Sequence, residues 1–153
     1  IGMPGIVAAM LLTGCGGERE GPEAQVRSLI KSAATAAEQK NVGTLHDMIS
    51  TQYKDDQGQD KRAIEALLRF HFLRNESLHL FAHTQTVTLP QPDNAQAIVL
   101  VAMAGVPIAA VEELSALRPD LHRFEVDFVR EDKRWRVRRA PWRRAEPGEF
   151  IGP

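Results

Sequence analysis

The stretch HRFEVDFVREDKRWRV, residues 122–137, decides the fold. Its first seven residues alternate between ring-bearing or apolar side chains and charged ones, which is the period of a half-buried strand. Residues 131–134 are polar and predict a turn, after which Trp135 and Val137 return apolar side chains to the inner face. The stretch therefore predicts two antiparallel strands with one face buried against another layer.

More strands are expected upstream of this pair. Residues 78–89 are rich in threonine, valine and aromatic residues and predict a strand that ends at Pro90. Residues 91–94 then predict a turn. Residues 95–104 are apolar on both faces, which is typical of a central strand. Residues 105–119 permit a short helix.

Three helices are predicted before the strands. The first begins at Pro22 and keeps one apolar face over residues 26–37. Thr44 and Asp47 have the spacing of a capping box at the start of a short second helix. Asp60 is placed to cap the third helix. Helices followed by strands indicate an α+β domain, with the N-terminal helices packed on one face of an antiparallel sheet.

Length and composition limit the classes of protein. A chain of 153 residues is long enough for one domain with a real core. Hydrophobic residues make up 43% and charged residues 25%, as in ordinary globular proteins. The formal net charge of -1 gives no global attraction to nucleic acid or anionic lipid. Nucleic acid is therefore not an expected partner.

The N-terminal residues predict an export signal. Residues 4–14 contain no charge and are too few to span a bilayer, but they fit the apolar part of a signal peptide. The single cysteine, Cys15, cannot form an internal disulfide. The basic start that such a peptide needs is absent, so residues 1–14 are expected to be part of a leader. A cytosolic protein with an apolar N-terminus and a buried thiol is the alternative.

The sequence Leu-Leu-Thr-Gly-Cys at residues 11–15 resembles the lipobox of bacterial lipoproteins. The resemblance implies cleavage before Cys15, a membrane anchor through lipid (palmitate included) on Cys15, and a tether over residues 15–21. Gly16 stands where an aspartate would favour the inner membrane. The implied location is therefore the outer membrane, facing the periplasm.

From about residue 23 to residue 144 the order of elements resembles the nuclear-transport-factor-2-like (SnoaL-like, cystatin-like cone) superfamily. The resemblance rests on the long first helix, the turn YKDDQG at residues 53–58, and the closing Trp135 to Val137 with Trp142. It implies a curved antiparallel sheet clasped by helices over residues 22–145, followed by a loose tail over residues 146–153. Several families with this fold are predicted to be exported lipoproteins without assigned activity, and this chain resembles them.

Carboxylates lining the cavity act as bases in isomerases and dehydratases of this fold, which makes Asp55 and Asp56 weak catalytic candidates. Either would work with Tyr53 or His83, and a general base would need burial to raise its pKa. The alternative is that short polar side chains here shape a turn and cap a helix. No catalytic residue is assigned on this basis.

The histidines suggest a pocket rather than a metal site. His79 and His83 share a face of the predicted strand, and His71 lies on the preceding helix. No spacing typical of metal ligands is present, so neither a metal nor a cofactor is expected. The expected lining of a pocket in the cone is Phe81, His83, Met103, Phe124 and Phe128.

A basic run with two tryptophans closes the domain. If the turn at residues 131–134 is a hairpin, Arg138 lies opposite Asp127, which would make part of the run an ordinary sheet surface. Trp142, Arg143 and Arg144 remain as a surface for an envelope partner.

The sequence thus predicts a membrane-anchored periplasmic domain that acts in binding or assembly, with a small apolar ligand or an envelope protein as partner. A homodimer through the sheet is also expected from the resemblance. The alternative is an isomerase-like or dehydratase-like enzyme acting on a small apolar substrate.

Overall fold

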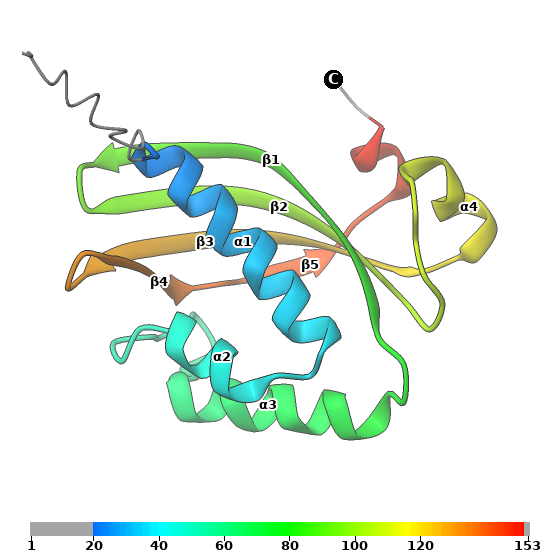
Figure 1. Ribbon diagram of the computed structural model, residues 1–153, viewed down its shortest axis with the longest axis horizontal. Helices are drawn as coiled ribbons and strands as arrows, with labels where there is room; N and C mark the ends of the chain where they lie inside the picture. Colours follow the sequence, from blue (N-terminus) through cyan, green and yellow to red (C-terminus); the bar gives the residue numbers. More distant parts are fainter. Residues whose placement is uncertain (1–19, 152–153) are drawn as a thin grey trace, which may run out of the picture.

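The computed structural model describes residues 20–151, which form an α+β domain with the three N-terminal helices on one face of a curved antiparallel sheet (Figure 1). The fold class predicted from the sequence is confirmed. The predicted leader and the lipidation site Cys15 lie outside the described residues.

The three helices are α1 (Pro22–Glu38), α2 (Val42–Met48) and α3 (Lys61–Arg74). The predicted cap of α3 is confirmed, because the Asp60 carboxylate accepts a hydrogen bond from the Ala63 N–H at 2.9 Å. The capping box predicted for α2 is wrong. Asn41 caps this helix by accepting from the Thr44 N–H at 3.1 Å, so α2 begins before Thr44. Asparagine is a stronger cap than threonine, which explains the earlier start.

Five strands follow: β1 (His79–Gln91), β2 (Asn94–Ala104), β3 (Asp120–Glu131), β4 (Arg134–Arg139) and β5 (Trp142–Arg144). The order is β1-β2-β3-β4, and β5 pairs with the first half of β3 while β4 pairs with its second half. Pro90 lies inside β1 rather than ending it. An edge strand tolerates a proline because its outward side needs no N–H donor.

The β3–β4 hairpin contains an extra residue. Phe128 is opposite Val137, but the next pair is Asp127 with Arg139. Arg138 is therefore the residue of a bulge, and the predicted pairing of Asp127 with Arg138 is wrong by one position. The expected cross-strand ion pair still forms, because the Arg139 Nε donates to the Asp127 carboxylate at 3.0 Å.

The segment after α2 covers the outer edge of β4. Ile49 forms a parallel bridge with Val137, and the Ser50 N–H donates to the Val137 carbonyl at 2.8 Å. A few residues on, the Lys54 N–H donates to the Arg138 carbonyl at 3.3 Å. The loop predicted for residues 50–59 is thus fixed to the sheet.

The main core lies between α1 and the concave face of the sheet. Val26 of α1 is fully buried against apolar side chains of β2, β3 and β4. Trp135 closes this core, and its Nε1–H donates to the Gln25 side chain at 3.0 Å. The buried members of this cluster are Val26, Ala95, Ala97, Val99, Val126, Phe128 and Trp135.

A second core lies on the opposite face. It is covered by the short helices η1 (Val111–Glu113), α4 (Leu114–Leu117) and η2 (Pro147–Phe150). Its buried members are Leu100, Ala102, Leu114, Ala145 and Phe150. The expectation of a loose tail after residue 145 is wrong for the described part. The sheet also has apolar side chains on this face, and Phe150 of η2 packs over them.

Candidate functional site

The Tyr53–Asp55 pair is a structural turn. The Tyr53 side chain is buried, and its hydroxyl donates to the Asp55 carboxylate at 3.4 Å. The other Asp55 oxygen accepts from the N–H groups of Gln57 and Gln59 at 3.0 and 2.9 Å. Burial, opposed by a hydrogen bond to the Ala140 backbone, raises the pKa of Tyr53 to about 12. The phenol therefore keeps its proton, and the carboxylate is used to hold the turn.

The other two catalytic candidates lie elsewhere. The Asp56 side chain is 76% exposed and pairs with the Arg139 guanidinium at 2.8 Å. His83 is exposed on the face of β1 that turns away from α1. The structure brings Tyr53 and Asp55 together but does not bring Asp56 or His83 into one site with them.

The five predicted pocket residues lie on two different faces of the sheet. Phe124 and Phe128 belong to the core under α1, and Met103 has the same strand parity as Val101 of that core. Phe81 packs in the opposite core, and His83 shares its parity. The five residues therefore do not line one cavity. Side chains one residue apart along a strand point to opposite faces, so the predicted set depended on a choice of parity that the sequence did not settle.

A different group of rings gathers at the start of β3, and we call it the His122 cluster: His71, His122, Phe124 and Trp142. The His122 ring is 4.9 Å from the Trp142 ring, edge to face, and 6.3 Å from the Phe124 ring. Strand pairing places these rings together, because Trp142 of β5 lies directly opposite Phe124 of β3. Edge-to-face contacts between rings are favourable by about 0.5–1.5 kcal/mol beyond the area that they bury.

The environment of His122 keeps its ring neutral. Burial lowers the pKa of His122, and the nearby charges of Arg144 and His71 lower it further, while Asp120 acts in the opposite direction. The Nδ1 atom of His122 is buried and has no hydrogen-bond partner in the structure. A buried polar atom without a partner costs roughly 1–3 kcal/mol, so it calls for an explanation.

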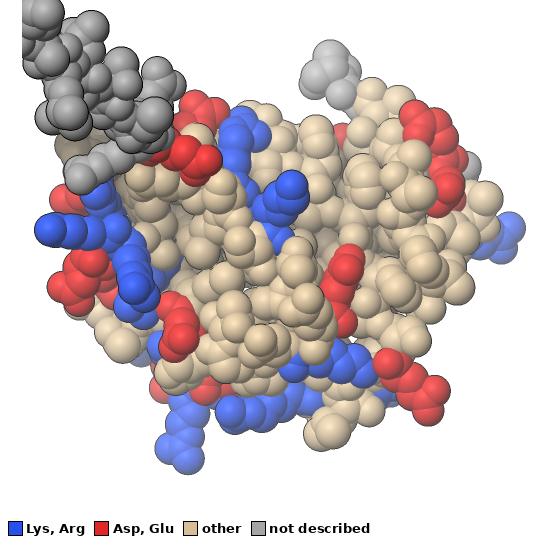
Figure 2. Space-filling view, in the orientation of Figure 1, with Lys and Arg blue, Asp and Glu red and all other residues tan. Residues whose placement is uncertain are grey.

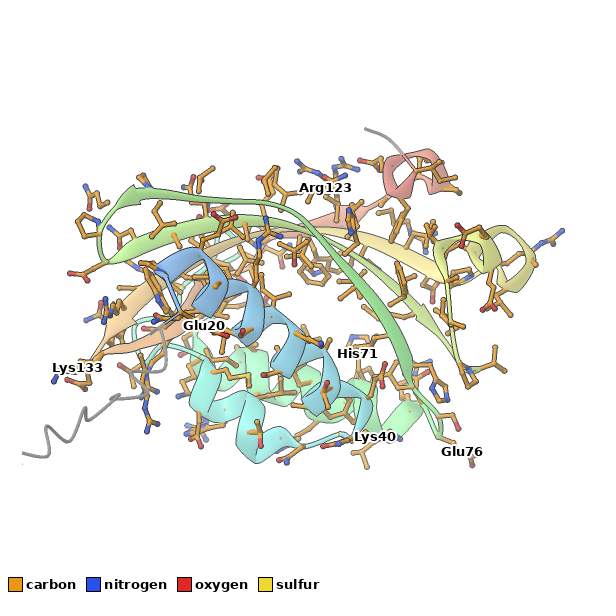
Figure 3. The ribbon with its side chains drawn as sticks, turned by 45° about the horizontal axis from the view of Figure 1, so that its top comes forward. Glu20, Lys40, His71, Glu76, Arg123 and Lys133 are labelled. Atoms are coloured by element: carbon orange, nitrogen blue, oxygen red, sulfur yellow. The ribbon has the colours of Figure 1, made fainter. Side chains whose placement is uncertain are left out.

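The cluster extends from the sheet to α3. Figure 3 shows His71 on α3, beneath the curve of the sheet. The ring of His71 is 5.9 Å from that of its neighbour Phe70. Phe70 is 52% exposed and Trp142 is 57% exposed. Trp142 thus remains open to solvent beside a neutral, incompletely bonded histidine, and Phe70 is exposed next to His71.

The three residues of the predicted partner surface also lie on two different faces of the sheet. Strand pairing sets Trp142 and Arg144 on the face of Phe124 and His122, whereas Arg143 pairs with Arg123 on the other face. Figure 3 shows Arg123 on the side of the sheet away from α1. Arg143 is bound to the Glu149 carboxylate at 2.6 and 3.2 Å, which holds the pKa of Glu149 at about 2.

An open groove of about 380 Å³ lies between α1 and β1. Residues of α1 and of the first half of β1 line it: Arg27, Ile30, Lys31, Ala34, Thr35, Glu38, Leu80, Phe81, Ala82 and Thr84. A second hollow, of about 330 Å³, lies on α1 and the start of α2. None of these lining residues belongs to the His122 cluster. Figure 2 shows basic and acidic side chains interspersed around the face that carries α1.

Residues 20–151 lack two further features. Within this range no three histidine, cysteine, aspartate or glutamate side chains come together as metal ligands would. In the same range, none of the helices has the length and apolar character needed to cross a bilayer.

Comparison with known proteins shows the fold. No protein-family model and no curated protein sequence matches the chain. Many solved structures match the chain, and three of them illustrate the similarity. A protein assigned as a dehydratase of the NTF2-like family from Streptomyces avermitilis has a TM-score of 0.63 at 12% identity, over 81% of this chain and 96% of that one. An NTF2-like protein of unknown function from Silicibacter pomeroyi has a TM-score of 0.59 at 14% identity, over 80% and 94%.

The third match is a domain of unknown function with a cystatin-like fold from Nostoc punctiforme, with a TM-score of 0.60 at 14% identity, over 84% of this chain and 82% of that one. The chain therefore has the NTF2-like, cystatin-like cone fold, as the resemblance implied. Proteins that share this fold include one assigned as a dehydratase and others without a known function, so the fold by itself names no activity.

His122 was not among the candidates from the sequence. The pattern of residues 122–128 shows it only as an apolar-face member of a strand. Trp142 was identified, but as a surface for a protein partner. His122 and Trp142 come together because β5 pairs with β3, and no local sequence pattern encodes that pairing.

Proposed function

We propose that this chain is a ligand-binding domain of the NTF2-like fold that is exported and held at the membrane by lipid on Cys15. The ligand is a small, mainly apolar molecule with one hydrogen-bond donor, and it binds at the His122 cluster. The observation that carries the proposal is the buried, unpartnered Nδ1 of a half-buried, neutral His122 beside the exposed ring of Trp142.

The chemistry of the cluster sets the class of ligand. Exposed aromatic rings favour contact with an apolar or aromatic group, because burying their surface is favourable by about 25 cal/mol per Å². A neutral imidazole nitrogen accepts a hydrogen bond, and a ligand donor would remove the cost of leaving Nδ1 unpaired. Because Nδ1 is buried, ligand binding requires the side chains that cover it to move aside. Positive charge on Arg144, which also lowers the pKa of His122, disfavours a cationic ligand.

Binding is tested with 2-naphthol as the probe, because it combines an aromatic body with one hydroxyl donor. The chain has two tryptophans. Trp142 is exposed, and the buried Trp135 serves as its control. We expect the fluorescence of 2-naphthol to change on titration with the protein, and Trp142→Ala to weaken binding at least tenfold. The variant Trp135→Phe should keep the response. Equal binding by the parent protein and Trp142→Ala would place the ligand elsewhere.

The role of His122 is separated from that of the rings by comparing 2-naphthol with naphthalene, which lacks the hydroxyl. If His122 accepts the hydrogen bond, the parent protein prefers 2-naphthol, and His122→Phe loses that preference while still binding naphthalene. A preference that survives in His122→Phe would refute the hydrogen bond to this residue.

An enzyme of the isomerase or dehydratase type is the second candidate, and one observation favours it. A histidine that stays neutral at neutral pH can accept a proton, as a general base must. In this version His122, rather than Asp55 or Asp56, removes the proton. The test is formation of the conjugated ketone from 4-hydroxy-4-phenyl-2-butanone, followed by its absorbance. Turnover that is lost in His122→Gln would support an enzyme, and binding without turnover would support the ligand-binding domain.

Anchoring is tested separately. We expect mass spectrometry of the protein made with its complete leader in a bacterial host to show a diacylglyceryl adduct on Cys15. The variant Cys15→Ser should lack the adduct and leave the membrane fraction. An unmodified Cys15 in the parent protein would refute the anchor and leave the binding proposal standing.

A further inference from the structure

We propose that the outer edge of β1 binds an extended acidic peptide segment of a partner protein, which adds to the sheet as a further strand in the groove between α1 and β1. Strand addition of this kind uses the unpaired backbone groups of an edge strand for affinity and the side chains around them for specificity. The site shares no residue with the His122 cluster and does not depend on the ligand proposed there.

The two edge strands of the sheet, β1 and β4, differ in whether their outer edge is covered. The outer edge of β4 is covered, because Ser50 and Lys54 donate backbone hydrogen bonds to it. In the part of the chain that the structure describes, no strand pairs with the outer edge of β1. An uncovered edge strand is a ready template for another chain.

Side chains of α1 reach the edge of β1 at two points. The Leu80 N–H donates to the Glu38 carboxylate at 2.8 Å. The Arg27 guanidinium donates to the Thr84 carbonyl at 3.3 Å. These contacts show that residues 80 and 84 direct their backbone groups outward.

The residue between them faces the same way. In an antiparallel pair alternate residues turn both backbone groups away from the neighbouring strand, so Ala82 does so as well. Four groups are then presented in sequence: the Leu80 carbonyl, the Ala82 N–H, the Ala82 carbonyl and the Thr84 N–H. All three residues line the groove. Alternating acceptors and donors at this spacing match the backbone of a strand.

The shape of the groove suits a peptide backbone. Ala34 on α1 and Ala82 on β1 are small residues that leave room between the two elements. Ile30 supplies an apolar contact for one side chain of the peptide. The volume of about 380 Å³ is enough for a few residues of extended chain and not for a folded element.

The groove is lined by two basic side chains, Arg27 and Lys31, and by one acidic side chain, Glu38. The Glu38 carboxylate accepts from the Leu80 N–H, so the charge that remains for a peptide is positive and selects an acidic segment. Lys31 is exposed in the middle of the groove, and none of the described ion pairs includes it. Arg27 also contributes positive charge, although its guanidinium forms an ion pair with the Glu23 carboxylate at 3.1 Å. A second copy of this chain would fit less well, because β1, His79–Gln91, contains no aspartate or glutamate to place over Lys31.

The test uses the full 153-residue chain with isotope-labelled backbone and the peptide acetyl-Val-Thr-Glu-Thr-Val-amide, whose valines and glutamate share one face. We expect the amide signals of Ala82 and Thr84 to shift and to exchange more slowly, while the side-chain signals of His122 and Trp142 do not move. A peptide N-methylated at alternate residues cannot donate to the edge, and should bind about tenfold more weakly.

Charge selection is tested by exchanging the sign on both partners. A peptide with lysine in place of the glutamate should bind up to about fivefold more weakly to the parent protein, as expected for one exposed ion pair. Lys31→Glu should reverse this preference. The matched control is Arg69→Glu, an exposed charge reversal on α3 outside the groove, which should leave the preference unchanged.

Three results would overturn the proposal. The first is an Ala82 amide that is unaffected by the peptide at millimolar concentration. The second is equal binding of the N-methylated peptide. The third is protection of the Ala82 amide that rises with protein concentration in the absence of peptide, which would assign the edge to a second copy of the chain.

Discussion

Replacing Phe150 with alanine is expected to destabilise the domain by about 3 kcal/mol. Phe150 is 7% exposed and packs on Leu100 and Ala102, which are both fully buried. Removal of a buried phenylalanine costs about 3–5 kcal/mol, because transfer free energy is lost and a cavity remains. The lower end of this range applies here, since η2 is near the end of the chain and can move to close part of the cavity.

The assay is thermal unfolding of the parent protein and the variant, followed by circular dichroism. For a chain of this size each kcal/mol shifts the Tm by about 2–4 °C, so a fall of about 6–12 °C is expected. Ile151→Ala is the matched control, because this neighbouring residue is 74% exposed and its loss should change stability by less than about 0.5 kcal/mol.

A result for Phe150→Ala that matches the control would refute the reasoning. It would mean that residues 147–150 do not cover the sheet in solution, and that the outer face of β2 is open. The two variants change side chains next to each other in the sequence, so only burial distinguishes them.

Three smaller predictions follow from single groups. Because burial lowers the pKa of His122, the unfolded chain takes up a proton before the folded one, so stability should fall as the pH drops below about 6.5; His122→Gln should flatten this part of a pH series of chemical unfolding curves. Asp60→Ala removes the cap of α3 and should cost about 1 kcal/mol by urea denaturation; no loss would mean that the cap is unimportant. Asp56→Asn breaks an exposed ion pair with Arg139 and should cost less than about 1 kcal/mol in the same assay; a larger loss would contradict the surface position of Asp56.

The elements of the fold follow closely from local patterns. Alternation over residues 122–128 predicts β3, and the apolar run of residues 95–104 predicts the central strand β2. Asp60 marks the start of α3, and Pro22 the start of α1. In each case the signal and the structure depend on the same residues, so no distant contact is needed to read it.

The details that failed depend on distant contacts. Nothing near Arg138 in the sequence indicates a bulge, and the Arg138 carbonyl accepts from Lys54 of the distant segment after α2. Phe150 falls in the predicted loose tail, whereas its position is set by the apolar face of β2. Both depend on the assembled sheet.

The candidate site was less predictable than the fold. Tyr53 and Asp55 were identified as a turn or a catalytic pair, and the structure shows the hydrogen bonds of a turn. The pocket residues were chosen with mixed strand parity. His122 is not among the site residues predicted from the sequence. Its distinguishing property is a buried nitrogen without a partner, which exists only after β5 has folded against β3.

The bridge between Ile49 and Val137 has a consequence for the order in which the chain folds. A ribosome completes all three helices well before it makes the residues of β4. The chain that follows α2 therefore has no strand to join until synthesis is almost finished, and contacts between such distant residues form slowly. We expect residues 49–54 to become ordered among the last parts of the molecule, and a fragment that stops at β3 to leave them free.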